Sequence, residues 1–264
     1  MPHIKLNNCN YYYETHGSGK ETIVLSHGLL WSGKMFHKQI NHFKTKYTVI
    51  TYDHRGQGKI QVTVGGYDMD QLYEDVVALL DYLKLKNVHF GGLSMGGFVA
   101  MRLAARRPDL VKSLILMETT AESEPSKFKY TILKNIVNVF GVKAVLQPVM
   151  KIMFGAKFLN DPERKEERKE WENKLLKNNK SITRSVSAVV DRDAISSELK
   201  NITCPTLILV GTQDVATTPE KAEFIHSKIK KSTLIYIDGG GHTSCIEEPE
   251  KYNMEIEHFL AQFD

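Results

Sequence analysis

One serine in this chain occupies a position suited to a nucleophile. Ser94 lies at the centre of Gly92-Leu-Ser-Met-Gly96, after the apolar run NVHFG and before the amphipathic run MGGFVAMRLAARRP. A serine on a sharp turn between a strand and a helix needs small neighbours, and glycine provides that clearance. The structural alternative is a glycine-rich turn in which Ser94 only caps the helix. The context favours a nucleophile for acyl transfer.

A serine hydroxyl needs an adjacent base, and the base needs a carboxylate that orients it. His242 follows the last apolar run of the chain, within Asp238-Gly-Gly-Gly-His, and Asp214 follows the preceding run TLILV. Glu118, at the end of the run LVKSLILM, is the rival for the orienting acid. We favour Asp214 because it is the last carboxylate at a strand end before His242.

Other histidines are weaker candidates for the base. His54 follows Asp53 at a strand end and could reach the same cleft, but a role in stabilising the loop is favoured. A solvated surface role is the default for histidines in amphipathic helical stretches, which here are His37, His42, His226 and His258.

The tetrahedral intermediate of acyl transfer needs hydrogen-bond donors for its oxyanion, and backbone N–H groups serve without rearrangement. Met95 would donate one from the first turn of its helix, where the amide has no partner and the helix dipole favours negative charge. The second donor is expected in the loop after Ser26-His27-Gly28. Leu29 is the first choice there, and Leu30 is the second.

These residues need a sheet whose strand ends lie along one edge. Short β-branched or aromatic runs predict eight strands: His3–Leu6, Tyr11–Thr15, Thr22–Ser26, Thr48–Tyr52, Val88–Gly91, Val111–Met117, Thr206–Val210 and Thr233–Ile237. Helical patterns follow at Met35–Thr45, Asp68–Leu83, Met95–Arg106, Pro219–Lys230 and Pro249–Phe263. The asparagines at 7, 8 and 10 favour an antiparallel hairpin at the sheet edge. The fold class is therefore α/β, with an eight-stranded, mostly parallel sheet flanked by helices.

The strand pattern stops between residues 121 and 201, where a helical insert rich in Lys, Met and Phe takes over. We predict a lid there, on a core formed by residues 1–120 and 202–264. The mixed charges of residues 161–180 indicate a solvated helix face. The candidates to line a substrate pocket are Leu30, Trp31, Phe140, Met150, Met153 and Phe154. Plain packing between lid helices is an equally good explanation for those in the insert.

The composition excludes several classes of protein. The 264 residues are 42% apolar and 25% charged, with a net charge of +4 and basic residues interleaved with acids, so nucleic acid is not expected as a partner. The N-terminus resembles no secretory signal and no window has the apolar length of a membrane span, so we expect a cytoplasmic protein that binds no membrane. Cys9, Cys204 and Cys245 have no C-x-x-C spacing and are interpreted as reduced thiols. No cluster of metal ligands is apparent, and the sequence leaves a monomer or a homodimer open.

Five segments together resemble the α/β-hydrolase superfamily, in the branch that holds esterases, enol-lactonases, carbon–carbon bond hydrolases and cofactor-free haloperoxidases. They are LSHGLLWSG, YDHRGQGK, GGLSMGG, GTQDVATTP and GGGHTSCIEEPEKYNMEIEHFL. The resemblance covers nearly the whole chain except the insert. It implies Ser94 as nucleophile, Asp214 as acid, His242 as base, and Leu29 and Met95 as the oxyanion amides, with no cofactor.

The same resemblance assigns Asp53, Arg55, Gly56 and Gly58 to a structural loop rather than to catalysis. The commonest form of that loop has a serine after the last glycine, whereas this chain has Lys59. The departure bears on the shape of the loop and not on the mechanism.

The expected reaction is hydrolysis of a carboxylic ester of a small, fairly apolar molecule through an acyl-enzyme. A lactone or a carbon–carbon bond is the alternative for the same three residues, and a small-molecule receptor on a hydrolase scaffold is a more distant one. A serine nucleophile argues against a haloalkane dehalogenase, because only a carboxylate leaves an alkyl ester that water can cleave at its carbonyl.

Overall fold

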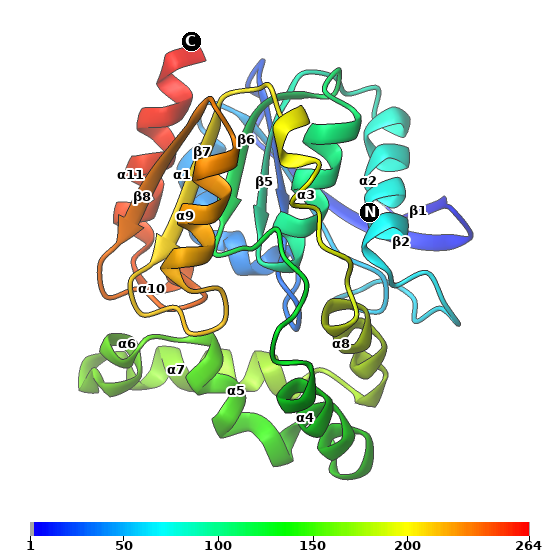
Figure 1. Cartoon of the computed structure of the whole chain (residues 1–264), viewed down its shortest axis with the longest axis vertical. Coiled ribbons are helices and arrows are strands. Elements are labelled where there is room, and N and C mark those ends of the chain that lie inside the picture. The colour runs from blue at the N-terminus through cyan, green and yellow to red at the C-terminus, as the bar shows by residue number, and fades with distance from the viewer. Residues whose placement is uncertain (1–2, 264) are drawn as a thin grey trace.

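The computed structural model describes residues 3–263, and its centre is one eight-stranded sheet with helices on both faces (Figure 1). The strands are β1 (His3–Leu6), β2 (Cys9–His16), β3 (Thr22–Ser26), β4 (Thr48–Tyr52), β5 (Val88–Leu93), β6 (Val111–Met117), β7 (Thr206–Gly211) and β8 (Ser232–Ile237). Their order across the sheet is β1-β2-β4-β3-β5-β6-β7-β8. β1 and β2 pair antiparallel, β2 pairs antiparallel with β4, and every pair from β4 to β8 is parallel. The predicted fold class is confirmed.

The turn between β1 and β2 shows why asparagine predicted a hairpin there. Asn7 and Asn8 have φ values of 45° and 59°, in the left-handed region that asparagine tolerates better than most residues. The turn joins an antiparallel pair at the edge of the sheet, as expected.

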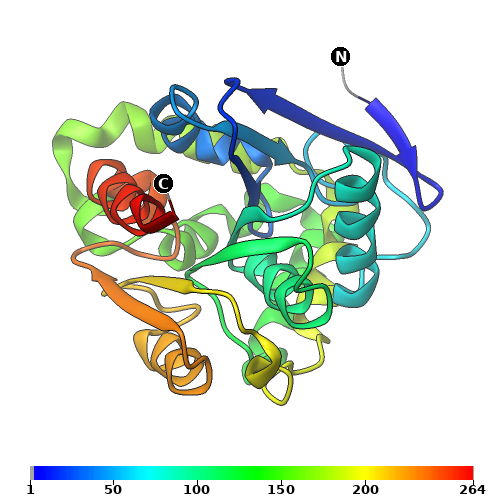
Figure 2. The ribbon, with the colours of Figure 1, turned by 90° about the horizontal axis from the view of Figure 1, so that it is seen from above.

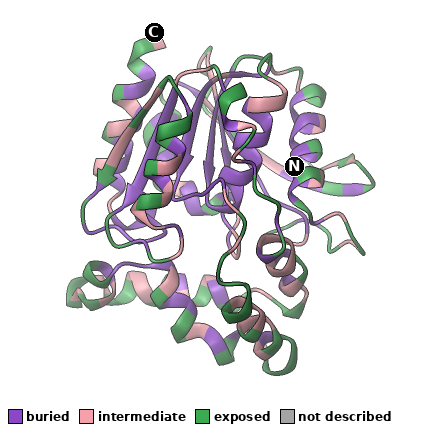
Figure 3. Cartoon of the chain, in the orientation of Figure 1, coloured by how far each residue is buried: buried purple, intermediate pink, exposed green. Residues whose placement is uncertain are grey.

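Helices cover both faces of the sheet because successive strand residues point to opposite sides. α1 (His37–Phe43) and α11 (Pro249–Leu260) cover one face, and α2 (Met69–Tyr82), α3 (Met95–Arg106) and α9 (Pro219–Lys228) cover the other (Figure 2). In β6, Ile115 and Met117 pack into the first core, whereas Leu114 and Leu116 pack into the second. The central strands are consequently buried on both sides (Figure 3).

The helices agree with their sequence patterns to within a few residues, apart from the first. α3 begins and ends where predicted. The helix expected over Met35–Thr45 is instead a 3-10 turn at Gly33–Phe36 followed by α1, which ends at Phe43. Only the second part of that pattern therefore forms an α-helix.

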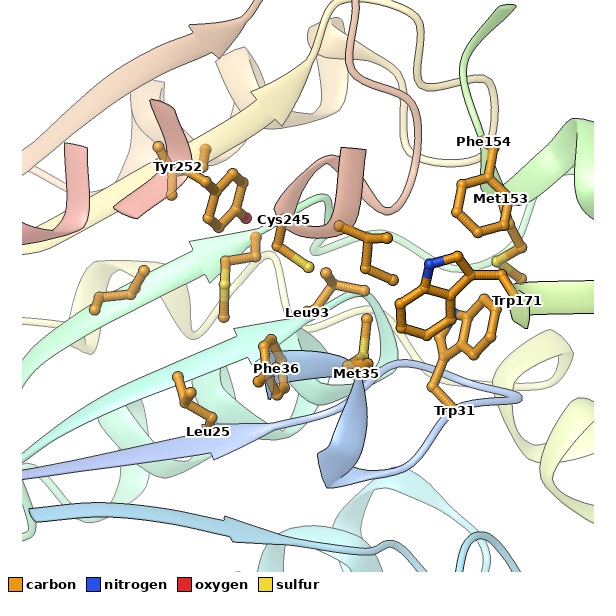
Figure 4. Packing of buried hydrophobic residues seen from close by; sticks show 14 of the residues in the cluster. Leu25, Trp31, Met35, Phe36, Leu93, Met153, Phe154, Trp171, Cys245 and Tyr252 are labelled. Carbon is orange, nitrogen blue, oxygen red and sulfur yellow. The ribbon is translucent and has the colours of Figure 1, made fainter. Parts of the chain in front are cut away.

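The chain between β6 and β7 forms a layer of helices beside the carboxyl ends of the strands (Figure 1). These helices are α4 (Lys127–Phe140), α5 (Leu146–Met153), α6 (Ala156–Asn160), α7 (Lys165–Leu176) and α8 (Thr183–Val190). Trp31 of the core anchors the layer, with ring centroids 5.4 Å from Trp171 and 6.1 Å from Phe154 (Figure 4). Whether the layer opens and closes as a lid stays a prediction.

Candidate active site

Ser94 lies on the sharp turn between β5 and α3, in a backbone conformation that side chains rarely adopt (φ 52°, ψ −112°). The flanking glycines make the turn possible. A Cβ at Gly92 would lie 2.2 Å from the carbonyl oxygen of Gly96, and one at Gly96 would lie 2.1 Å from that of Ser26. The backbone of Ser94 is also fixed, because its N–H donates to Met117 O at 2.8 Å and its carbonyl accepts from the Thr119 hydroxyl at 2.9 Å. The strained turn is thus held by its neighbours.

Ser94, His242 and Asp214 form one hydrogen-bonded chain of side chains. The Ser94 Oγ lies 2.8 Å from Nε2 of His242, and Nδ1 of His242 lies 2.8 Å from Oδ2 of Asp214. A carboxylate can only accept, so Nδ1 carries the ring proton and Nε2 is left as an acceptor for the serine proton. All three side chains are largely buried. The order of contacts is the one that acyl transfer requires.

Asp214 is held by the turn that follows β7. Its Oδ1 accepts the N–H groups of Ala216 and Thr217 at 2.8 and 3.0 Å, and its Oδ2 accepts the Thr217 hydroxyl at 2.7 Å. Our reading of the sequence did not identify Thr217. The spacing Asp-x-x-Thr after a strand is a signal that could have found it, since aspartate side chains commonly bond backbone N–H groups two or three residues on.

The rival acid, Glu118, does not contact His242. It is fully buried and accepts hydrogen bonds from the hydroxyls of Ser244 and Tyr252. Burial, together with the nearby Asp214, holds the pKa of Glu118 well above its usual range. Glu118 therefore lies behind the site as a buried acid.

His54 likewise lies outside the chain of contacts. Its Nε2 is 3.0 Å from the Ser26 hydroxyl, and its backbone N–H donates to His27 at 2.9 Å. Burial lowers the pKa of His54 well below the usual value, so the imidazole is held neutral. These contacts fit the loop-stabilising role expected for it.

The two candidate oxyanion donors differ in how the structure presents them. Met95 is the first residue of α3, where an N–H has no intrahelical partner. The Leu30 N–H is already used, because it donates to Gln57 Oε1 at 2.8 Å. The Leu29 N–H makes no hydrogen bond within residues 3–263, and Leu29 lines the cavity beside Ser94. Of the two leucines, Leu29 is thus the one with a free donor.

The loop after β4 is structural in its contacts. Asp53 accepts the N–H groups of Gly33 and Lys59, both at 2.8 Å. Arg55 forms a buried bidentate ion pair with Asp75, at 2.5 and 2.8 Å. The backbone N–H of Lys59 closes the loop by donating to Asp53. The loop is therefore closed although Lys59 stands where the commonest form of the loop has a serine.

A narrow cavity of about 80 Å³ lies beside Ser94 and His242. The core contributes Leu29, Trp31 and Phe98 to its wall, among others. The insert contributes, among others, Tyr130, Met153, Val186 and Val189. Trp31 and Met153 were predicted here, whereas our reading of the sequence missed Glu124, Tyr130 and Arg192. Arg192 had one usable signal, a basic residue between two acids, Asp191 and Asp193, just after the run SVSAVV.

Four residues predicted for the pocket lie elsewhere. Phe140 is 73% exposed at the last turn of α4, beside Gly141, where no other element covers it. Met150 and Phe154 are buried in the packing of the insert and face a separate outer groove. Leu30 turns away from the cavity toward a cleft that includes Lys59 and Trp171, because its backbone takes a positive φ of 74°.

Glu247 joins the insert to the loop that carries His242. Its carboxylate accepts the N–H of Gly155, between α5 and α6, at 2.8 Å and the N–H of Gly241 at 3.0 Å. Burial raises the pKa of Glu247 to about 7, against the opposing effect of these hydrogen bonds. The position of the residue before His242 therefore depends on a contact with the insert.

The sequence matches one family over most of its length. The model of the α/β-hydrolase fold matches residues 21–249. The chain belongs to this family. Individual proteins are also similar to this α/β hydrolase. The chain is 30% identical over 254 residues to 3-oxoadipate enol-lactonase 2 of Acinetobacter baylyi, and the match covers 96% of this chain and 93% of that protein.

A second relative, from Pseudomonas syringae, bears the provisional name of a carbamate hydrolase, RutD; it is 26% identical, over 91% of this chain and 93% of its own length. Among solved structures, the enol-lactonase of Burkholderia xenovorans superposes with a TM-score of 0.91 at 26% identity, covering 98% of this chain and all of that one. These similarities support hydrolase activity on a small molecule. Within residues 3–263, no helix is long and apolar enough to cross a membrane, and no group of three or more His, Cys, Asp or Glu side chains is arranged to hold a metal.

Proposed function

We propose that this α/β hydrolase cleaves a carboxylic ester of a small, fairly apolar substrate through an acyl-enzyme. Ser94 is the nucleophile, His242 the base and Asp214 the orienting acid. The observation that supports this most is the pair of 2.8 Å contacts that link the three side chains in that order at the wall of a cavity.

The reaction begins when Nε2 of His242 takes the proton of the Ser94 hydroxyl as its oxygen attacks the substrate carbonyl. The C=O bond becomes a C–O⁻ single bond, and the N–H groups of Leu29 and Met95 bind this oxyanion. Collapse of the intermediate expels the alkoxide, which takes the proton from His242. Water then attacks the acyl-enzyme with His242 again as base, and release of the acid restores Ser94.

The cavity supports the choice of a small, mostly apolar substrate. Its volume of about 80 Å³ is well below that of pockets for drug-sized ligands, and aliphatic and aromatic side chains form most of its wall. We propose that the helices of the insert act as a lid that sets this size, because they supply the wall opposite Ser94.

A lactone is the second candidate. A lactone is a cyclic ester, so the same residues would open it, with the leaving alkoxide tethered to the acyl group. The 30% identity to an enol-lactonase over nearly the full length favours this candidate over a carbon–carbon bond.

The test is a panel of p-nitrophenyl esters, lactones and carbamates, with Ser94→Ala beside the wild-type protein. We expect ester or lactone turnover, lowered in Ser94→Ala by about 10⁵- to 10⁶-fold. Equal rates for the two proteins, or turnover of carbamates alone, would refute the proposal.

A further inference from the structure

The cavity beside Ser94 contains a buried cation in a mostly apolar wall. Arg192, just after α8, is 6% exposed and lines the same cavity as Ser94. Its Nε donates to the carbonyl of Glu122 at 3.0 Å. Its Nη1 donates to the carbonyl of Val189 at 2.7 Å and to the carboxylate of Glu124 at 3.2 Å. The guanidinium is thus fixed at the return of the insert to the core.

The second terminal nitrogen of Arg192, Nη2, makes no hydrogen bond within residues 3–263. One face of the guanidinium lies over the ring of Phe98, with 4.4 Å between its central carbon and the ring centroid. Burial lowers the pKa of Arg192, against the opposing effect of Glu124. The two N–H groups of Nη2 are therefore without a partner among residues 3–263, on a residue that lines the cavity.

Tyr130 of α4 adds a further donor to the same wall. It lines the cavity with Arg192, and its hydroxyl has no hydrogen-bond partner among residues 3–263. Burial, with Glu124 and Asp214 nearby, raises the pKa of Tyr130 to about 12, so the phenol keeps its proton at neutral pH. The insert therefore presents O–H and N–H groups that have no hydrogen-bond partner among residues 3–263.

Donors without a protein partner in a mostly apolar pocket discriminate among ligands, because a ligand that lacks an acceptor displaces their water and leaves them unpaired. The charge of the acceptor also matters. Glu124 already neutralises the Arg192 cation in part, and a carboxylate on the substrate would bring a second negative charge beside it. An uncharged carbonyl oxygen avoids this repulsion and still accepts from Nη2 of Arg192 and the Tyr130 hydroxyl.

We propose that the substrate carries a second, uncharged carbonyl oxygen, of a keto or amide group, in its acyl part, and that Arg192 and Tyr130 bind it. The proposal rests on the proposed ester or lactone hydrolysis and specifies its substrate class. It makes the two residues determinants of specificity rather than of the chemical step.

Three p-nitrophenyl esters of matched length test the proposal: the pentanoate, the 4-oxopentanoate and the hydrogen succinate, each corrected for the rate with Ser94→Ala. We expect kcat/KM for the 4-oxopentanoate to exceed that of the other two by about tenfold or more. Equal values for the pentanoate and the 4-oxopentanoate would overturn the proposal. So would a preference for the succinate, which would show that an anion is recognised.

Two variants and one control variant locate the effect. Tyr130→Phe removes one oxygen atom and should reduce the preference for the keto ester over the pentanoate severalfold. Arg192→Met should abolish the preference, and Phe140→Ala, on the exposed end of α4, should leave it unchanged. A preference that survives both Tyr130→Phe and a folded Arg192→Met would overturn the assignment. Absence of hydrolysis of all three esters by wild-type protein would instead refute the proposed ester hydrolysis itself.

Discussion

The strand ends of the core and the helices of the insert both face the cavity, but they are held in different ways. α3, which follows Ser94, buries ten of its twelve residues, whereas α4 of the insert buries one of its fourteen, Val137. The core fixes Ser94 and Asp214 by backbone hydrogen bonds in tight turns. The insert packs on the core through aromatic contacts of Trp171 and Phe154 with Trp31. The candidate catalytic residues thus lie on the more deeply buried part of the molecule, whereas much of the pocket wall lies on the part with fewer buried residues.

The assignment of catalytic residues to the core is tested most strongly at the two acids that follow strands, Asp214 after β7 and Glu118 after β6. Asp214→Asn should lower kcat by about 10⁴-fold, because the amide favours the wrong tautomer of His242. Glu118→Gln should change kcat by less than about tenfold, because Glu118 contacts Ser244 and Tyr252 and its raised pKa already favours the neutral form. Steady-state kinetics on a p-nitrophenyl ester measures both. A larger loss in the folded Glu118→Gln protein would make Glu118 the orienting acid.

The core could be predicted from the sequence in detail because its signals are local. Gly92 and Gly96 mark the turn, α3 has clear limits, and β-branched runs bounded by turn residues mark the strands. The sequence ranked Leu29 above Leu30 but did not contain the contact that distinguishes them, because the Leu30 N–H donates to Gln57, which lies far along the chain.

The pocket wall was predicted poorly for a physical reason. An amphipathic helix shows in its sequence which face is apolar, but not which apolar residues face the cavity, the core or solvent. Phe140 is exposed and Met150 packs inside the insert, whereas Tyr130 and Arg192, polar residues, reach the cavity. Such contacts are set by the packing of α4, α5 and α8 on the core, and periodicity does not contain that information.

The anchoring of the insert can be tested at Trp31. Replacement by Ala leaves a cavity against Trp171 and Phe154, and should lower the free energy of unfolding by about 3–5 kcal/mol. Phe140→Ala, an aromatic residue exposed on the same layer, should change it by less than about 0.5 kcal/mol. Urea denaturation measures both values. Similar losses for the two variants would mean that Trp31 does not anchor the insert.

The link between the core and the insert at Glu247 can be tested by the pH dependence of the free energy of unfolding. The pKa of the Glu247 carboxyl is about 7 in the folded protein, against an ordinary value of 4.5, so the folded state favours the protonated form. The stability from this shift is fully present below pH 4.5 and is lost as the pH rises through about 7, a change of about 3 kcal/mol. Glu247→Gln cannot ionise, so its free energy of unfolding should rise relative to wild type by that amount over this range. Parallel stability curves would show that Glu247 does not bridge Gly155 and Gly241 as a buried acid.

The central claim is that Ser94 is the activated nucleophile of this site. Treatment with a fluorophosphonate, followed by intact mass and peptide sequencing by mass spectrometry, tests it directly. The account predicts one adduct per chain, on Ser94, formed in step with the loss of hydrolysis and absent in Ser94→Ala. An adduct on another residue, or complete loss of hydrolysis with Ser94 unmodified, would contradict it.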